Sequence, residues 1–140
     1  MKKINVYFSF MVLAIFALGA CTSSSSDDMS NSDLGEVLSG GDNWVVSYFW
    51  DKTKEETHKF SGYTFNFKSD GVFEAISASG VVKGTWSISS SSQKLIINIS
   101  PIGVLDELSD DWIILEKTNK LIKLKDDNDE HLEELHFKLQ

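Results

Sequence analysis

The chain of 140 residues contains no arginine and a single cysteine. The first shortage excludes binding through arginine, and the second excludes a disulfide within the chain. Without arginine, the chain lacks the side chain that binds phosphate and carboxylate groups through two parallel hydrogen bonds. One cysteine, Cys21, cannot form a disulfide within the chain. A buried apolar core must therefore stabilise the folded domain, and about 100 residues are enough to build one.

Positive charge is scarce as well, since 13 lysines face 21 acidic residues. If the first 20 residues are removed as a leader, Lys2 and Lys3 leave with them. The remaining 11 lysines and 21 acids give a net charge of −10. Such a surface repels nucleic acids and anionic lipid headgroups. The sequence therefore predicts no nucleic-acid partner.

The N-terminal segment has the layout of a secretory signal peptide. A basic start, Met1 to Lys3, precedes an apolar stretch from Ile4 to Leu18, which is too short and interrupted for a convincing transmembrane helix. Leu18-Gly19-Ala20-Cys21 resembles a lipobox, at which bacterial lipoproteins are cleaved and acylated. We expect residues 1–20 to be a lipoprotein signal peptide and Cys21 to carry lipid such as palmitate. The alternative is an ordinary secreted protein.

Residues 21–33 are expected to form a flexible tether. The segment from Thr22 to Asp33 contains six serines, three aspartates and one apolar residue, too few apolar groups for a packed core. The pair Asp27-Asp28 resembles the export signal that carries lipoproteins of the Bacteroidetes group to the outer face of the outer membrane. A soluble linker without a signal is the alternative. The predicted location is the outer membrane, with the lipid on Cys21 as anchor and surface exposure left open.

From Trp44 onward, apolar side chains recur with a period of two, which is typical of half-buried β-strands. Eight strand candidates follow one another. Their apolar positions are Trp44, Val46, Tyr48 and Trp50; Tyr63, Phe65 and Phe67; Phe73 and Ala75; Val82, Gly84, Trp86 and Ile88; Leu95, Ile97 and Ile99; Ile113 and Leu115; Ile122 and Leu124; and Leu135, Phe137 and Leu139.

The segments between these strands are short turns. Asp70-Gly71 and Ser79-Gly80 are two-residue hairpin signals, and Asn119-Lys120 and Asp126 to Glu130 mark two later turns. Consecutive strands joined in this way pair antiparallel, and closure into a barrel removes the exposed sheet edges. Residues 34–140 are therefore predicted to form an all-β, eight-stranded antiparallel up-and-down barrel.

Two segments lie outside this pattern. Ser32 to Gly40 is expected to carry a short helical turn that stops at Gly40. Pro101 to Asp111 is the longest connection and contains another possible helical turn. It is either a lid or partner contact, or a crossover that plugs one end of the barrel.

Three stretches carry a resemblance to a known family. The approach Gly40-Gly41-Asp42-Asn43 before Trp44, the run FSGYTFNFKSDGVF from Phe60 to Phe73, and Gly84-Thr85-Trp86 are similar to small lipocalin-like domains of secreted Bacteroidetes proteins. The resemblance covers Leu34 to Gln140 and implies a lipocalin-like barrel. The spacing from Gly41 to Trp44 departs from the glycine-any-tryptophan pattern of lipocalins, so the resemblance supports the architecture more than an activity.

No spacing in the sequence predicts catalysis or metal binding. His131 and His136 are five residues apart, one more than a helical zinc pair needs, and on a strand they would face opposite sides. Asp126 to Glu130 has the oxygen density of a calcium loop but lacks the central glycine and final glutamate of an EF-hand, so a solvated turn is favoured. We expect no enzyme activity, catalytic residue, metal ion or cofactor.

Aromatic side chains dominate the predicted inward faces, and they are the candidate barrel-interior or ligand-binding residues: Trp44, Tyr48, Trp50, Tyr63, Phe65, Phe67, Phe73, Trp86 and Phe137. One hypothesis is a lipid-anchored envelope protein whose barrel holds a small hydrophobic ligand. The alternative is that the rings fill the barrel. The chain would then be an interaction module that acts through its loops on an unknown envelope protein, as an accessory subunit or inhibitor.

Overall fold

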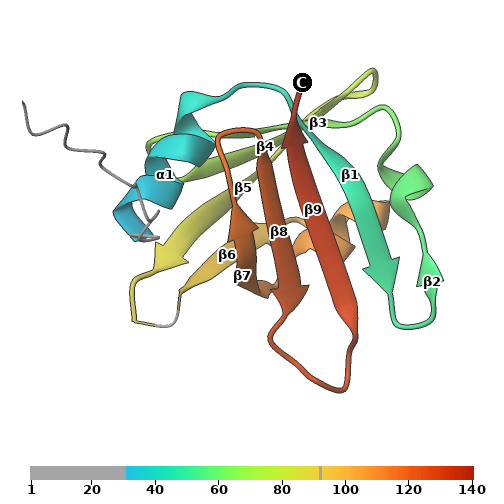
Figure 1. The fold of residues 1–140 in the computed structure, drawn as a ribbon. Coiled ribbons are helices and arrows are strands. Elements are labelled where there is room, and N and C mark those ends of the chain that lie inside the picture. The colour runs from blue at the N-terminus through green and yellow to red at the C-terminus, as the bar shows by residue number, and fades with distance from the viewer. Residues whose placement is uncertain (1–30, 92) are drawn as a thin grey trace, which may run out of the picture.

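The computed structural model describes residues 31–91 and 93–140, whose strands form one antiparallel sheet closed into a barrel (Figure 1). The predicted eight-stranded barrel with sequential strand order is confirmed. The predicted signal peptide, Cys21 and residues 22–30 of the tether lie outside the described residues. The barrel strands are β1 (Trp44–Asp51), β3 (Thr64–Phe67), β4 (Val72–Ser77), β5 (Gly80–Ser89), β6 (Lys94–Ile99), β7 (Asp111–Lys117), β8 (Leu121–Asp126) and β9 (Glu133–Leu139).

Strand β1 closes the barrel unevenly. It pairs with β9 along its whole length, from Trp44 opposite Leu139 to Asp51 opposite Glu133. On its other edge a single pair, Trp44 opposite Phe65, joins it to β3. A short strand that the sequence pattern did not indicate, β2 (Lys54–Glu55), pairs with the far end of β1.

Between these two contacts, the 3-10 helix η1 (Thr57–Phe60) lies along β1. The backbone N–H of Phe49 donates to the Thr57 hydroxyl at 2.8 Å, and the backbone N–H of Glu56 donates to the Phe49 carbonyl at 2.8 Å. These bonds satisfy part of the strand edge that β3 leaves unpaired.

The predicted hairpin turns are present, and their glycines have the backbone conformation that such turns require. Gly71, between β3 and β4, has φ +86°, and Gly80, at the start of β5, has φ +130°. Residues with a Cβ adopt such angles at a cost, which explains glycine at both turns. The Asp70 carboxylate also accepts the backbone N–H of Val72 at 3.1 Å.

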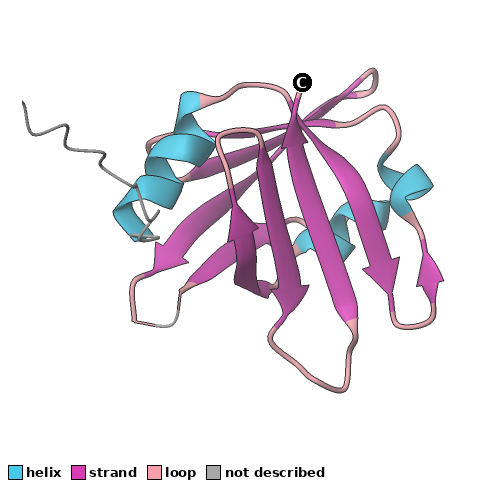
Figure 2. Ribbon diagram, viewed as in Figure 1, coloured by secondary structure: helices cyan, strands magenta, loops and turns pink. Residues whose placement is uncertain are grey.

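Besides η1, the segments α1 (Asn31–Gly40) and η2 (Gly103–Leu108) pack on the barrel (Figure 2). The helix α1 is longer than the predicted single turn but stops at Gly40, as expected. Its side chains Leu34 and Leu38, four residues apart, are fully buried over β3 and β5. The 3-10 helix η2 lies in the long connection and buries Leu105 and Leu108 in the core. This packing favours the plug interpretation of that connection over a free lid.

Candidate functional site

Five of the nine predicted interior residues form the centre of the barrel core. Phe65 stacks on Phe73 with ring centroids 5.6 Å apart, and Phe67 meets Phe137 edge to face at 5.3 Å. Together with Trp44, these side chains are at most 1% exposed. Rings in such contact occupy the space in which the ligand of a hollow barrel would lie.

Two further predicted residues, Tyr63 and Trp86, are half-buried and pack against this core. The Trp86 indole N–H donates to the Lys68 carbonyl at 2.8 Å, and its ring meets Phe67 edge to face at 5.6 Å. Tyr63 also lines a surface pocket of about 470 Å³ between η1 and the start of β1. Both rings therefore lie on the predicted side, at the margin of the core.

The predicted direction of Tyr48 and Trp50 was wrong. A β-bulge between Val46 and Tyr48 inserts one extra residue in β1, so that Phe49 enters the core in place of its neighbours. The outer Tyr48 ring lies against His136 with centroids 4.8 Å apart. A period-two pattern cannot reveal a bulge, and every later residue of the strand then changes face.

The pattern also missed Trp112. Its side chain is fully buried, and its indole N–H donates to the Leu108 carbonyl at 3.0 Å. Ile113 and Leu115 were assigned to one face of this strand, but Trp112 and Ile114 are the residues of β7 that pack in or against the core. Leu115 is 48% exposed. Alternation counted from Trp112 would have identified the correct face.

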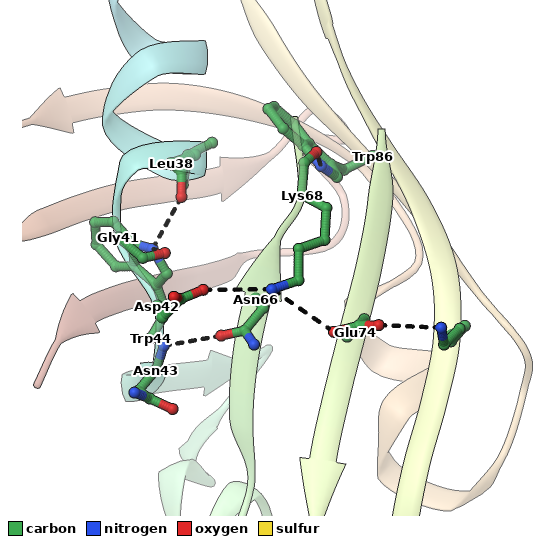
Figure 3. A network of polar contacts seen from close by, with 10 residues as sticks. Leu38, Gly41, Asp42, Asn43, Trp44, Asn66, Lys68, Glu74 and Trp86 are labelled. Carbon is green, nitrogen blue, oxygen red and sulfur yellow. Dashed lines mark hydrogen bonds and ion pairs between the residues drawn. The ribbon is translucent and has the colours of Figure 1, made fainter. Parts of the chain in front are cut away.

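Polar contacts fix the end of the barrel near α1 (Figure 3). The Trp44 indole N–H donates to the carbonyls of Leu38 and Gly41, both at 3.2 Å. The side-chain oxygen of Asn66 accepts the backbone N–H of Asn43 at 2.8 Å. The polar atom of Trp44 is thus bonded within the chain, which gives this predicted binding residue a structural role.

At the opposite end of the barrel, β1 and β8 end and β9 begins (bottom of Figure 1), and each of these strands has an acidic residue there. Asp51 ends β1, Asp126 ends β8 and Glu133 begins β9. Asp51 and Glu133 are paired in register across β1 and β9. In each strand, the residue two positions nearer the barrel centre is fully buried, so alternation places all three carboxylates on the core side.

These carboxylates have few compensating partners. Asp126 is only 5% exposed; its Oδ1 accepts the backbone N–H of Asn128 at 2.9 Å, and its Oδ2 lies 3.9 Å from His131 Nδ1. The Oδ1 atom of Asp51 is buried and has no hydrogen-bond partner among residues 31–91 and 93–140. Burial raises the pKa of the Glu133 carboxyl, and the negative charges of Asp51 and Asp126 raise it further.

A surface pocket of about 260 Å³ adjoins this acidic end. Its apolar wall consists of Trp50, Leu115 and Leu132, of which Leu132 is 65% exposed. Its polar wall includes Asp126, His131 and Glu133. The sequence pattern could not assemble this set, because it placed Trp50 inside the barrel and treated the turn after β8 as an isolated solvated loop.

No protein-family model matches this chain, and no curated protein matches its sequence. Its fold is similar to the crystal structure of a DUF4847 family protein from Bacteroides vulgatus, determined at 1.00 Å resolution. The TM-score is 0.57 at 16% sequence identity, over 75% of this chain and 96% of that one. At this identity the likeness shows the barrel fold alone. Among residues 31–91 and 93–140, no helix is long and apolar enough to span a bilayer.

Proposed function

We propose that this chain is a lipid-anchored protein of the cell envelope, in which a filled, lipocalin-like barrel serves as a scaffold for binding at the surface. The packing of the core carries this proposal. Phe65, Phe67, Phe73 and Phe137 are at most 1% exposed and contact one another ring to ring. A carrier of a small hydrophobic molecule needs a cavity of roughly 300–1,000 Å³ lined by such rings. The ring contacts therefore favour the interaction module over the carrier.

The proposal places binding at the end of the barrel formed by β1, β7, β8 and β9. There, Trp50, Leu115 and Leu132 surround the pocket of about 260 Å³ and bring apolar surface beside charged side chains. Aromatic and aliphatic groups in a pocket with a polar rim are typical of binding surfaces. We propose a binding role for this surface and no catalytic activity.

The anchor in this proposal is Cys21, within Leu18-Gly19-Ala20-Cys21. Lipid on this cysteine would hold the domain at the outer membrane, and Asp27-Asp28 would direct it to the cell surface. A net charge of −10 without the leader excludes nucleic acid and leaves an envelope protein as the expected partner.

Native mass spectrometry of the full lipoprotein, extracted from its host membranes in mild detergent, tests the filled barrel. We expect the mass of the acylated chain with no stoichiometric apolar molecule attached. A small apolar molecule that is bound one to one and lost on denaturation would instead establish the carrier hypothesis.

Protease accessibility on intact cells tests the predicted location. We expect the wild-type chain to be cleaved by added protease, and a variant carrying Asp27→Asn and Asp28→Asn to be acylated but protected. Asp33→Asn is the matched control, because it removes an aspartate charge from the same segment. Equal protection of all three proteins would contradict surface export.

A further inference from the structure

We propose that Asp126, His131 and Glu133 bind a divalent transition-metal ion such as Zn²⁺. The site lies at the end of the barrel where the proposed function places binding, and the inference rests on the proposed function for this location alone. The metal ion would be one ligand of the surface pocket. The sequence predicted no metal site, because His131 was considered as a zinc ligand together with His136 and not together with the acids of β8 and β9.

The geometry brings one imidazole nitrogen and two carboxylate oxygens together. The ligand atoms of the three residues lie within 4.8 Å of one another, and Asp126 Oδ2 lies 3.9 Å from His131 Nδ1. Tetrahedral zinc with bonds of 2.0–2.2 Å holds its ligand atoms about 3.3 Å apart. The His131 side chain is 51% exposed, so a small change of its side-chain angles would close the remaining distance.

The three residues are held on a short, bonded turn between two paired strands. The His131 backbone N–H donates to the Asn128 carbonyl at 2.9 Å, and the Glu133 N–H donates to the His131 carbonyl at 2.8 Å. Asp126 and Glu133 belong to β8 and β9, which pair along their length. The barrel therefore fixes two ligands, and the turn presents the third.

The charge around Asp126 is a separate argument for a bound cation. Glu56, which is 4% exposed, is contacted by two lysines, Lys54 and Lys59, as burial of a carboxylate requires. Asp126 is buried to the same degree, yet within the described residues its ion-pair partner is a histidine, and no lysine pairs with it or with Glu133. The buried, unpaired Oδ1 of Asp51, opposite Glu133 in register, adds a third carboxylate.

Two lysines beside the turn pair with other acids, and Lys52, whose charge acts on Glu133, forms no ion pair with it within the described residues. Lys125 lies 3.8 Å from Asp129, and Lys94 contacts Asp127 at 2.5 Å. Both pairs lie on the flanks of the turn. Among the described residues no lysine ion pair neutralises the carboxylates of Asp126 and Glu133, and a bound cation would do so.

The donor set selects the class of ion. Calcium and magnesium take oxygen ligands, whereas an imidazole with two carboxylates suits zinc and its first-row neighbours. Three protein ligands leave one position of a tetrahedral ion for water or for a donor atom of a partner. That position adjoins the pocket lined by Trp50, Leu115 and Leu132.

Zinc binding by the full chain, freed of metal and held in mild detergent, tests this site. We would titrate Zn²⁺ in competition with a colorimetric chelator and follow the melting temperature with and without Zn²⁺. The wild-type chain is expected to bind one equivalent and to melt at a higher temperature with zinc. His131→Ala and Glu133→Gln should each weaken binding by at least about tenfold and remove the thermal shift.

Two variants serve as matched controls. His58→Ala removes a histidine outside the site, and Glu130→Gln removes an exposed carboxylate from the same turn; both should bind zinc as the wild type does. The proposal is overturned if the wild-type chain binds no zinc, or if His131→Ala binds it as tightly as His58→Ala. An apolar molecule found inside the barrel would overturn the proposed function but not this site, so the two failures are distinguishable.

Discussion

At Asp110, burial and neighbouring negative charge act against the ionised carboxylate. Burial raises the pKa of this carboxyl above its ordinary value of 3.8, and the charges of Asp126 and Asp111 raise it further. A hydrogen bond from the Asp111 backbone N–H, 2.6 Å from Oδ1, opposes them. The folded state therefore binds this proton more tightly than the unfolded state, and stability falls as the pH rises through the interval between the two pKa values.

We expect Asp110→Asn to raise the free energy of unfolding at pH 7. The gain should stay below about 1 kcal/mol, because the side chain is partly solvated, and should vanish below about pH 4, where the wild-type carboxyl is protonated. Urea unfolding followed by circular dichroism at both pH values measures the effect. Asp129→Asn, at a side chain that is 96% exposed, is the control for the charge change. Destabilisation by Asp110→Asn at pH 7 would contradict this account.

Gly84 is required for the close approach of two strands. A Cβ at this position would lie 2.1 Å from the Asn98 carbonyl oxygen and 2.8 Å from the Ile99 Cα, both backbone atoms of β6. Gly84→Ala is expected to cost about 1–3 kcal/mol in thermal or urea unfolding, because backbone atoms cannot move aside as a side-chain tip can. Gly35→Ala is the control, since its Cβ would meet Ile88 at an ordinary 3.6 Å. Equal effects of the two substitutions would argue against this strand contact.

At the scale of the element, the bulge in β1 reverses the expected importance of neighbouring aromatic residues. Phe49 is fully buried and meets Phe60 edge to face at 5.2 Å, whereas Trp50 lies on the outer face. We expect Phe49→Ala to lower the free energy of unfolding by about 3–5 kcal/mol and Trp50→Ala by about 1 kcal/mol or less. Urea unfolding compares them directly. A larger loss for Trp50→Ala would mean that the strand has no bulge.

The positions of the strands could be predicted because they depend on local signals. Period-two alternation and turns such as Asp70-Gly71 placed all eight barrel strands. Their faces were predicted less well. The register shift at Val46 to Tyr48 in β1 leaves no mark in the pattern, and in β7 the alternation was counted from Ile113 instead of Trp112. The acidic end was not predicted, because the bulge in β1 turns Trp50 outward and Asp51 toward the core, and because the turn after β8 was interpreted as a solvated loop.

At the scale of the whole molecule, the centre of the barrel is a network of rings. Phe67 lies within it, with ring centroids 4.9 Å from Phe73, 5.3 Å from Phe137 and 5.6 Å from Trp86. Each of these contacts joins side chains of different strands, so one ring bridges several strands of the barrel. Removal of such a ring leaves a space that its neighbours fill only in part.

This packing predicts how the barrel responds to a small apolar molecule. Phe67→Ala should lower the free energy of unfolding by about 3–5 kcal/mol and open an apolar cavity, and benzene should then raise its melting temperature. The melting temperature of the wild-type chain should not respond to benzene, because its rings already fill that space. Tyr48→Ala removes an outer ring and is the control, with no expected response. A benzene-dependent rise in the wild-type chain would show that the barrel holds a cavity and would restore the carrier hypothesis.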